Sequence, residues 1–123
     1  MKKDILDADF ESFSFSDEIL AAIKNMGFEN PTEIQIKTIP AVLEGNDVLA
    51  RADTGSGKTA AFVLPLLDNL SNQNVYAQKG RSKRFDASTR VASNCVQIVV
   101  LVPTRELAIQ VAEVFSTVAE NIQ

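Results

Sequence analysis

The sequence predicts an α/β fold, a parallel sheet flanked by helices. The short apolar segment Val48–Ala50 runs directly into a glycine-rich loop followed by a helical pattern, and a second apolar run, Cys95–Val102, precedes another helical pattern. Strands that alternate with helices form parallel sheets, and nearly continuous apolar runs suit strands buried on both faces. Because such a sheet needs more than two strands, we expect a truncated domain with uncovered apolar edges and marginal stability.

The composition excludes several classes of enzyme. The 123 residues are 46% hydrophobic and 23% charged, which is typical of a globular domain. They include no His, which rules out Ser-His-Asp, Cys-His and His-based zinc sites within this chain. The single cysteine, Cys95, has no partner for an internal disulfide; it fits a reducing compartment and is interpreted as filling core space.

Charge and hydropathy indicate a cytoplasmic protein without a membrane segment. No apolar run approaches the ~20 residues that span a bilayer. Lys2 and Lys3 are followed by acidic residues instead of the apolar stretch of a secretory signal. The net charge is -4, yet residues 71–94 contain five basic residues and one acidic residue. The chain is therefore not a uniformly basic nucleic-acid-binding protein.

The beginning of the chain predicts an acidic extension and then a helix. Residues 1–15 carry three phenylalanines and are too short to fold alone. Ser16 suits the N-cap position, acidic residues follow it in the first turn, and Gly27 suits the C-terminal cap. Ile19 and Ile23 belong to the apolar stripe between them, so we expect a helix over this stretch.

Capping residues and periodicity predict the other helices. Thr32 opens a second short helix, which Pro40 should interrupt before the chain reaches Gly45. A third helix follows the glycine-rich loop and should be bent by Pro65. Residues 71–94 are polar without a period and are expected to form a loop. The last block is helical, with one apolar face made of Leu107, Val111, Val114, Phe115 and Val118.

The glycine-rich loop predicts a phosphate-binding site. Such a loop needs glycines that let backbone N–H groups turn toward an anion, a helix N-terminus behind them, a lysine for the outer phosphates and a hydroxyl for magnesium. Gly55, Gly57, Lys58 and Thr59 supply these parts in order, although Ala52 stands where the general pattern has Gly. The alternative is a Gly-Ser turn that happens to precede a helix. A lysine at a helix N-terminus opposes the dipole, however, and is better explained by a bound anion.

With two other motifs, this loop resembles the DEAD-box ATP-dependent RNA helicases. Residues 27–35, Gly-Phe-Glu-Asn-Pro-Thr-Glu-Ile-Gln, are similar to that family's Q motif, and Phe10 lies at about the place of its isolated upstream aromatic. Residues 52–59 look like motif I, which also begins with Ala. Residues 103–108, Pro-Thr-Arg-Glu-Leu-Ala, match motif Ia. The resemblance runs from about Phe10 to the end of the chain, apart from the polar segment 71–94.

The resemblance implies that residues 16–123 are the N-terminal portion of a RecA-like P-loop NTPase domain, which binds ATP with Mg²⁺. The implied nucleotide-binding residues are Phe10, Phe28, Thr32, Gln35, Ala52, Thr54, Gly55, Ser56, Gly57, Lys58 and Thr59. Lys58 and Thr59 would also be catalytic, and Thr59 would be the magnesium ligand.

Two of the implied adenine contacts have structural alternatives. Gln35 would hydrogen-bond the adenine edge, because an amide offers a donor and an acceptor in one plane, and Phe28 would lie against the base. From the residues alone, Gln35 also completes a capping box with Thr32, so it caps the helix, contacts adenine, or does both in different states. Phe10 either contacts the base or simply packs; in the latter case Phe13 or Phe15 is an alternative docking residue.

The third motif implies an RNA contact by Pro103, Thr104 and Arg105. These residues would follow a buried strand at the carboxyl edge of the sheet and begin a helix, a place that favours an RNA phosphate. The alternative is that Pro103 and Thr104 merely start the helix and Arg105 is solvated. Residues 71–94 are interpreted as a solvated loop, with contact to RNA phosphates as the alternative.

The catalytic acids of the family are missing from this sequence. Hydrolysis of ATP needs carboxylates that hold magnesium and orient water, and in the family both lie in an Asp-Glu-Ala-Asp motif that these 123 residues lack. We therefore expect the N-terminal part of an RNA helicase, inactive alone, whose partners are RNA, ATP or ADP and the rest of the helicase with its second RecA-like domain. The alternatives are a short non-catalytic nucleotide- or RNA-binding module, or another P-loop NTPase.

Overall fold

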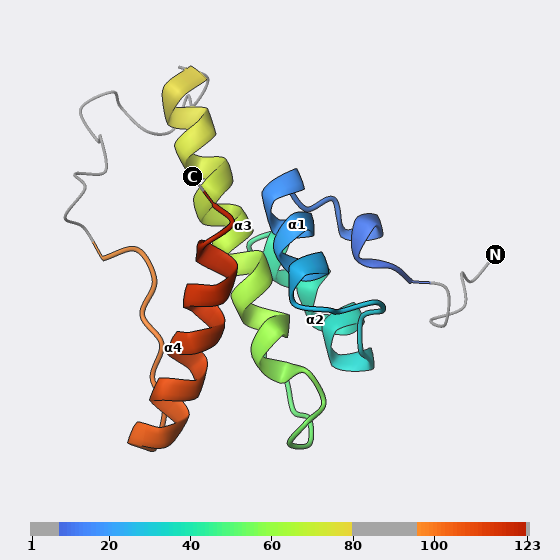
Figure 1. The fold of residues 1–123 in the computed structure, drawn as a ribbon, viewed down its shortest axis with the longest axis vertical. Helices are drawn as coiled ribbons and strands as arrows, with labels where there is room; N and C mark the ends of the chain where they lie inside the picture. The colour runs from blue at the N-terminus through green and yellow to red at the C-terminus, as the bar shows by residue number, and fades with distance from the viewer. Residues whose placement is uncertain (1–7, 80–95, 123) are drawn as a thin grey trace.

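The computed structural model describes residues 8–79 and 96–122 of the chain (Figure 1). The described residues form a 3-10 helix and four α-helices, namely η2 (Phe10–Phe13), α1 (Asp17–Asn25), α2 (Glu33–Leu43), α3 (Lys58–Lys79) and α4 (Arg105–Ala119). The long helix α3 is central and contacts each of the other three α-helices. No helix in this part of the chain is both long and apolar enough to cross a membrane.

The helices begin where the capping residues predict. Ser16 Oγ accepts the N–H of Ile19 at the start of α1, and Thr104 Oγ1 accepts the N–H of Leu107 at the start of α4. Helix α1 ends before Gly27, which has a φ of 75°. The sequence was sufficient to predict these helix ends, because an N-cap side chain and a left-handed glycine each act within one helical turn.

Helix α2 is continuous where an interruption was expected, and helix α3 is longer than expected. Helix α2 continues through Pro40 to Leu43, so the expected interruption is wrong. Pro40 is exposed, and the backbone carbonyl that loses its partner can be hydrated. Helix α3 passes through Pro65 and extends to Lys79, which makes residues 71–79 helical instead of a loop, because no Gly or Pro follows Pro65 in that stretch. The rest of the expected loop, residues 80–94, lies outside the described residues.

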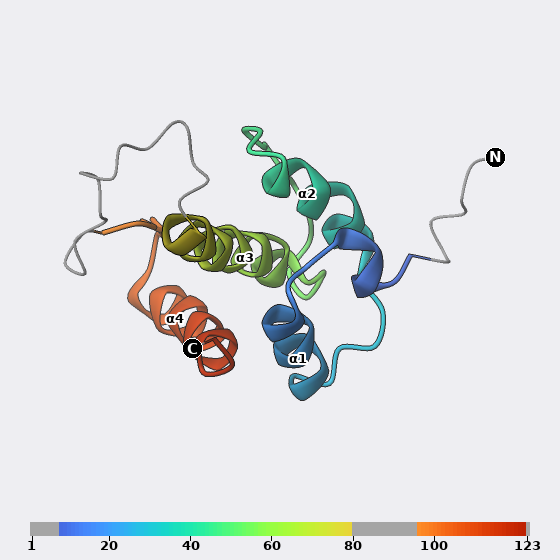
Figure 2. The ribbon, with the colours of Figure 1, turned by 90° about the horizontal axis from the view of Figure 1, so that it is seen from above.

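The expected sheet is not confirmed. No strand occurs among the described residues, and the segments 47–52 and 96–103 form no backbone hydrogen bonds with other described residues. The burial expected for both segments is wrong, since Leu49 is 102% exposed and Leu101 is 90% exposed. The two segments lie apart in both views (Figures 1 and 2), so neither supplies the pairing edge that the other needs. Cys95, at the start of the second expected strand, lies outside the described residues.

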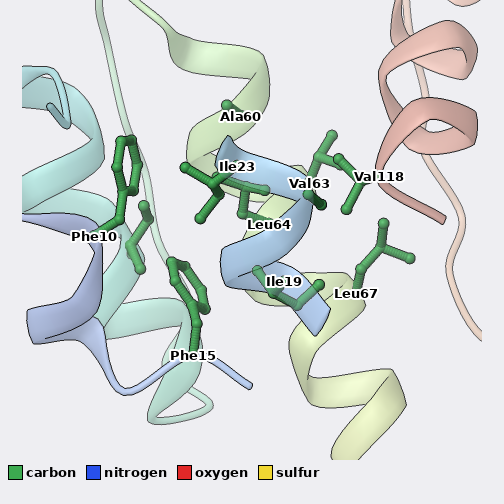
Figure 3. Packing of buried hydrophobic residues seen from close by; sticks show 11 residues of the cluster. Phe10, Phe15, Ile19, Ile23, Ala60, Val63, Leu64, Leu67 and Val118 are labelled. Atoms are coloured by element: carbon green, nitrogen blue, oxygen red, sulfur yellow. The ribbon is translucent and has the colours of Figure 1, made fainter. Parts of the chain in front are cut away.

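The core is formed by helices and by the N-terminal extension (Figure 3). Two phenylalanines of the extension, Phe10 and Phe15, are buried together with residues of α1 and α3, so both contribute to packing. The other members of this cluster are Ile19, Ala22, Ile23, Ile39, Ala60, Val63, Leu64, Leu67 and Val118. The predicted apolar face of α4 is confirmed: Val111 and Val118 are buried, and its other members are partly covered.

One buried carboxylate joins α1 to α3. Asp68 is 2% exposed and accepts the backbone N–H of Ser16 at 2.8 Å and the side-chain amide of Asn72 at 3.1 Å. Ser16 is the N-cap of α1, so the negative charge lies at the positive end of that helix. Buried polar groups need partners, and these bonds satisfy the carboxylate while they fix the beginning of α1 against α3.

Candidate functional site

The glycine-rich loop has the backbone conformation that its glycines predict. Gly55 and Gly57 have φ values of 82° and 83°, in the left-handed region that residues with a side chain rarely adopt. Between them, the N–H of Ser56 donates to the carbonyl of Asp53 at 3.2 Å and closes a turn. Helix α3 begins directly after the loop, at Lys58. The loop thus ends at a helix N-terminus, the polarity that favours anions.

Gly57 is also required for space. A Cβ atom built on Gly57 would lie 2.6 Å from Gln35 Nε2 and 2.9 Å from Thr32 Oγ1, whereas one on Gly55 would meet nothing within 4 Å. The N-terminal turn of α2 therefore packs directly against the second glycine of the loop. This close approach connects residues that are 22 positions apart in the sequence.

Gln35 makes that connection with its side-chain amide. Its Oε1 accepts the backbone N–H of Thr32 at 3.0 Å, which confirms the predicted capping box, and its Nε2 donates to the carbonyl of Gly57 at 3.0 Å. Only 3% of Gln35 is exposed. The bond to the loop was not predicted from the sequence; the signal that this glutamine is buried was Ile39, four positions later on the same face of the helix.

A cleft of about 810 Å³ opens at the loop. The residues predicted for phosphate binding that line it are Thr54, Gly55, Gly57, Lys58 and Thr59. Its far wall consists of residues 99–102 and of the α4 side chains Leu107, Gln110, Val111 and Val114. Helices α3 and α4 begin at the same end of the molecule (Figure 1), so their positive ends face the same region. Ala52 and Ser56 belong to the loop without lining the cleft.

The two predicted aromatic contacts differ in position. Phe28 is 38% exposed and lines the same cleft as the glycine-rich loop. Phe10 is buried and does not line the cleft; its ring stacks on that of Phe28, with the centroids 6.4 Å apart. Phe10 therefore supports Phe28 in this structure, which is the packing alternative, and its contact with a base stays a prediction.

The residues predicted to contact RNA lie at the N-terminus of α4. Pro103, Thr104 and Arg105 are all exposed, and none of them lines the cleft at the loop. Thr104 is the N-cap, so its hydroxyl already serves the helix, as the structural alternative proposed. Arg105 makes no salt bridge or side-chain hydrogen bond within the described part of the chain.

Comparison with known proteins assigns the family. A model of the DEAD/DEAH box helicase family matches residues 32–123, three quarters of the chain. The chain belongs to this family. It is 46% identical over 118 residues to the ATP-dependent RNA helicase dbp9 of Aspergillus oryzae and 43% identical over 118 residues to the probable ATP-dependent RNA helicase ddx56 of Dictyostelium discoideum. Each alignment covers 96% of this chain but only 17% and 15% of those helicases.

Solved helicase structures share the fold. A DEAD box protein from the hyperthermophile Methanococcus jannaschii matches 89% of the chain with a TM-score of 0.67 and 39% sequence identity. A dbp5 variant from S. cerevisiae, solved with gle1 and ip6, matches 93% with a TM-score of 0.70 and 28% identity. The chain spans 25% of each of those chains. The expected RecA-like architecture is therefore supported at the level of the fold, although the described residues contain no strand.

Proposed function

We propose that this chain is the N-terminal part of an ATP-dependent RNA helicase, that it binds ATP through the glycine-rich loop and Gln35, and that it contacts RNA at the start of α4. Membership of the DEAD/DEAH box family and relatives named as ATP-dependent RNA helicases support this proposal. In the complete protein, ATP binding and hydrolysis would be coupled to local separation of RNA duplexes. The single observation that carries the proposal is the bond between Gln35 and Gly57.

That bond leaves part of the hydrogen-bonding capacity of the Gln35 amide unused. A glutamine amide has two N–H donors and a carbonyl oxygen with two lone pairs. One donor is used on Gly57 and one lone pair on Thr32, so one donor and one acceptor remain. The N7 and N6 positions of adenine require one donor and one acceptor. In this proposal Gln35 caps α2, holds the loop and selects adenine; because it is 3% exposed and does not line the cleft, the adenine contact requires that its side chain be uncovered when nucleotide binds.

The loop also fits the phosphates and their metal. The first N–H groups of α3 have no partner within the helix, and Lys58 is exposed at the same place. Thr59 would offer its hydroxyl to Mg²⁺, which supplies charge neutralisation for the outer phosphates when it is bound. The described residues contain no cluster of three or more His, Cys, Asp or Glu that could hold a metal ion. Thr59 would be the magnesium ligand that this part of the chain contributes, beside the oxygens of the phosphates.

We infer that the chain alone does not turn over ATP. Orienting and deprotonating the attacking water requires carboxylates, and no Asp-Glu-Ala-Asp sequence occurs in the 123 residues. The role of this chain would be binding and positioning. Measured release of phosphate from ATP by the 123-residue chain alone would contradict this assignment.

The base selectivity of binding tests the role of Gln35. Titrations of ADP and GDP into the wild-type chain should show tighter binding of ADP, and Gln35→Ala should remove most of that preference, because one good bidentate amide pair discriminates by about 1–3 kcal/mol. Gln110→Ala is the matched control, since Gln110 lines the same cleft from α4 and has no proposed contact. An unchanged preference in Gln35→Ala would contradict the adenine contact.

RNA binding tests the role of Arg105. Arg105→Ala should weaken binding of single-stranded RNA similarly for different sequences and flatten its salt dependence, as the loss of one phosphate contact does. The measurement is fluorescence anisotropy with two unrelated RNAs at several salt concentrations. Lys24→Ala removes an exposed charge from α1 and serves as control. A sequence-selective loss in Arg105→Ala would contradict a phosphate contact.

A further inference from the structure

An acidic residue stands inside the proposed phosphate-binding loop. Asp53 follows Ala52 and precedes the first glycine by two positions, and it lines the same cleft as Lys58 and Thr59. Its backbone carbonyl accepts both the N–H and the Oγ–H of Ser56, so the residue is held at the first position of the turn in the loop. Neither the helix start nor the phosphate cradle requires a carboxylate at this place.

The charge of Asp53 has no partner in the described structure. The residue is exposed, and its carboxylate takes part in no side-chain hydrogen bond or salt bridge with the side chains of residues 8–72 and 96–122. Lys58, the cation of the loop, is not within salt-bridge distance of it. An anionic ligand in the cleft would therefore meet both the cation of Lys58 and the carboxylate of Asp53.

We propose that Asp53 sets the affinity of the loop for nucleotides by repelling the polyphosphate. This inference rests on the proposed nucleotide site and adds to it a residue that opposes binding. The Coulomb energy between like charges grows with the charge of the ligand, so the repulsion is greatest for ATP, smaller for ADP and absent for adenosine. Because Asp53 is exposed, salt screens the effect. The result is a loop that holds ATP more weakly than its glycines, lysine and helix N-terminus would otherwise allow, and that releases phosphate-bearing products more readily.

The test removes the charge without changing the shape of the side chain. Titrations of ATP, ADP and adenosine into wild type and Asp53→Asn are compared at low and high salt. We expect Asp53→Asn to bind ATP about 3- to 10-fold more tightly at low salt, ADP by a smaller factor and adenosine equally, with the factors shrinking as salt increases. Asp47→Asn makes the same change of net charge at an exposed residue outside the cleft and should leave all three affinities unchanged.

Three results separate this inference from the proposed function. Equal or weaker ATP binding by Asp53→Asn overturns the inference, as does a gain that is the same for adenosine as for ATP. An equal gain in Asp47→Asn overturns it too, because net charge would then be responsible and not the loop. Failure of the wild-type chain to bind ATP or ADP at all overturns the proposed function instead. The unfolding temperatures of the variants confirm that each is folded.

Discussion

At the scale of the residue, the second glycine of the loop is the point where two motifs meet. Gly57 has a positive φ and is covered by the side chains of Thr32 and Gln35. A helix N-terminus and a phosphate loop therefore share one contact, and a change in either affects both. Gly45 has the same φ of 83° but nothing within 4 Å of a Cβ atom, which makes it a natural control.

Gly57→Ala should be markedly more harmful than Gly45→Ala. Both substitutions force alanine into the left-handed region, which costs roughly 1–2 kcal/mol. Only at Gly57 must the side chains of Thr32 and Gln35 also move. We expect a larger loss of unfolding free energy in urea for Gly57→Ala, together with loss of ADP binding. Equal losses of stability in the two variants would show that the contact with α2 is not close in solution.

How far the sequence predicts the site differs from residue to residue. The loop glycines, Lys58 and the capping pair of Thr32 and Gln35 were predicted, because each acts on neighbours within a few positions. The bond from Gln35 to Gly57 was not, since it depends on how α2 packs against α3. The stacking of Phe10 on Phe28 was not predicted either. The sequence alone left open whether Phe10 packs or contacts a base.

At the scale of the element, a buried carboxylate fixes the beginning of α1. Asp68 accepts the N–H of Ser16, and the charge faces the positive end of α1. Helix α1 is held at its other end by a hydrogen bond between the side chains of Asn25 and Asn121, at 2.8 Å. The exposed pair of Lys37 and Glu33 on α2, by contrast, only lowers the pKa of Glu33 and adds little to stability.

Asp68→Ala should destabilise the chain by about 1–3 kcal/mol, because it leaves the partly buried N–H of Ser16 without its acceptor. Asn72→Ala removes only the second, less essential partner of Asp68 and should cost less. Urea unfolding followed by circular dichroism measures both. If the two variants lose the same stability, the bond to Ser16 is not what holds α1.

Helix lengths show where local patterns fail. The starts of α1 and α4 were predicted from Ser16 and Thr104, yet α2 was expected to be interrupted at Pro40 and α3 to end before residue 71. The expectation for α2 rested on one proline, and the expectation for α3 rested on the polar composition of residues 71–94. Continuation of a helix depends on the absence of steric breaks and on packing against other helices, and neither is visible in a short window.

At the scale of the whole molecule, the apolar segment 96–102 forms no backbone hydrogen bonds with other described residues. Val99 is 73% exposed and Leu101 90% exposed, and no residue of the segment is charged. The sheet was the part of the fold that the sequence predicted and the described residues do not show. Strand pairing joins segments that are distant in sequence, so two strand patterns do not by themselves make a sheet.

The isolated chain should associate through this segment as its concentration increases. Unpaired, uncharged and β-branched segments pair with copies of themselves. Leu101→Lys should suppress the association, whereas Ile109→Lys, at a residue of α4 that is 50% exposed, should not. Light scattering over a range of protein concentrations measures the mass. A chain that stays monomeric at all concentrations, or equal effects of the two variants, would contradict the prediction.

The central claim is that the glycine-rich loop binds the phosphates of an adenine nucleotide. The most direct measurement is a calorimetric titration of ADP with magnesium into the wild-type chain and into Lys58→Ala. Lys58 is exposed and lies outside the hydrophobic core, so its loss should leave the fold intact and remove most of the affinity. Saturable binding by wild type that is lost in a folded Lys58→Ala variant is the predicted result. Equal binding by the two proteins would contradict the account.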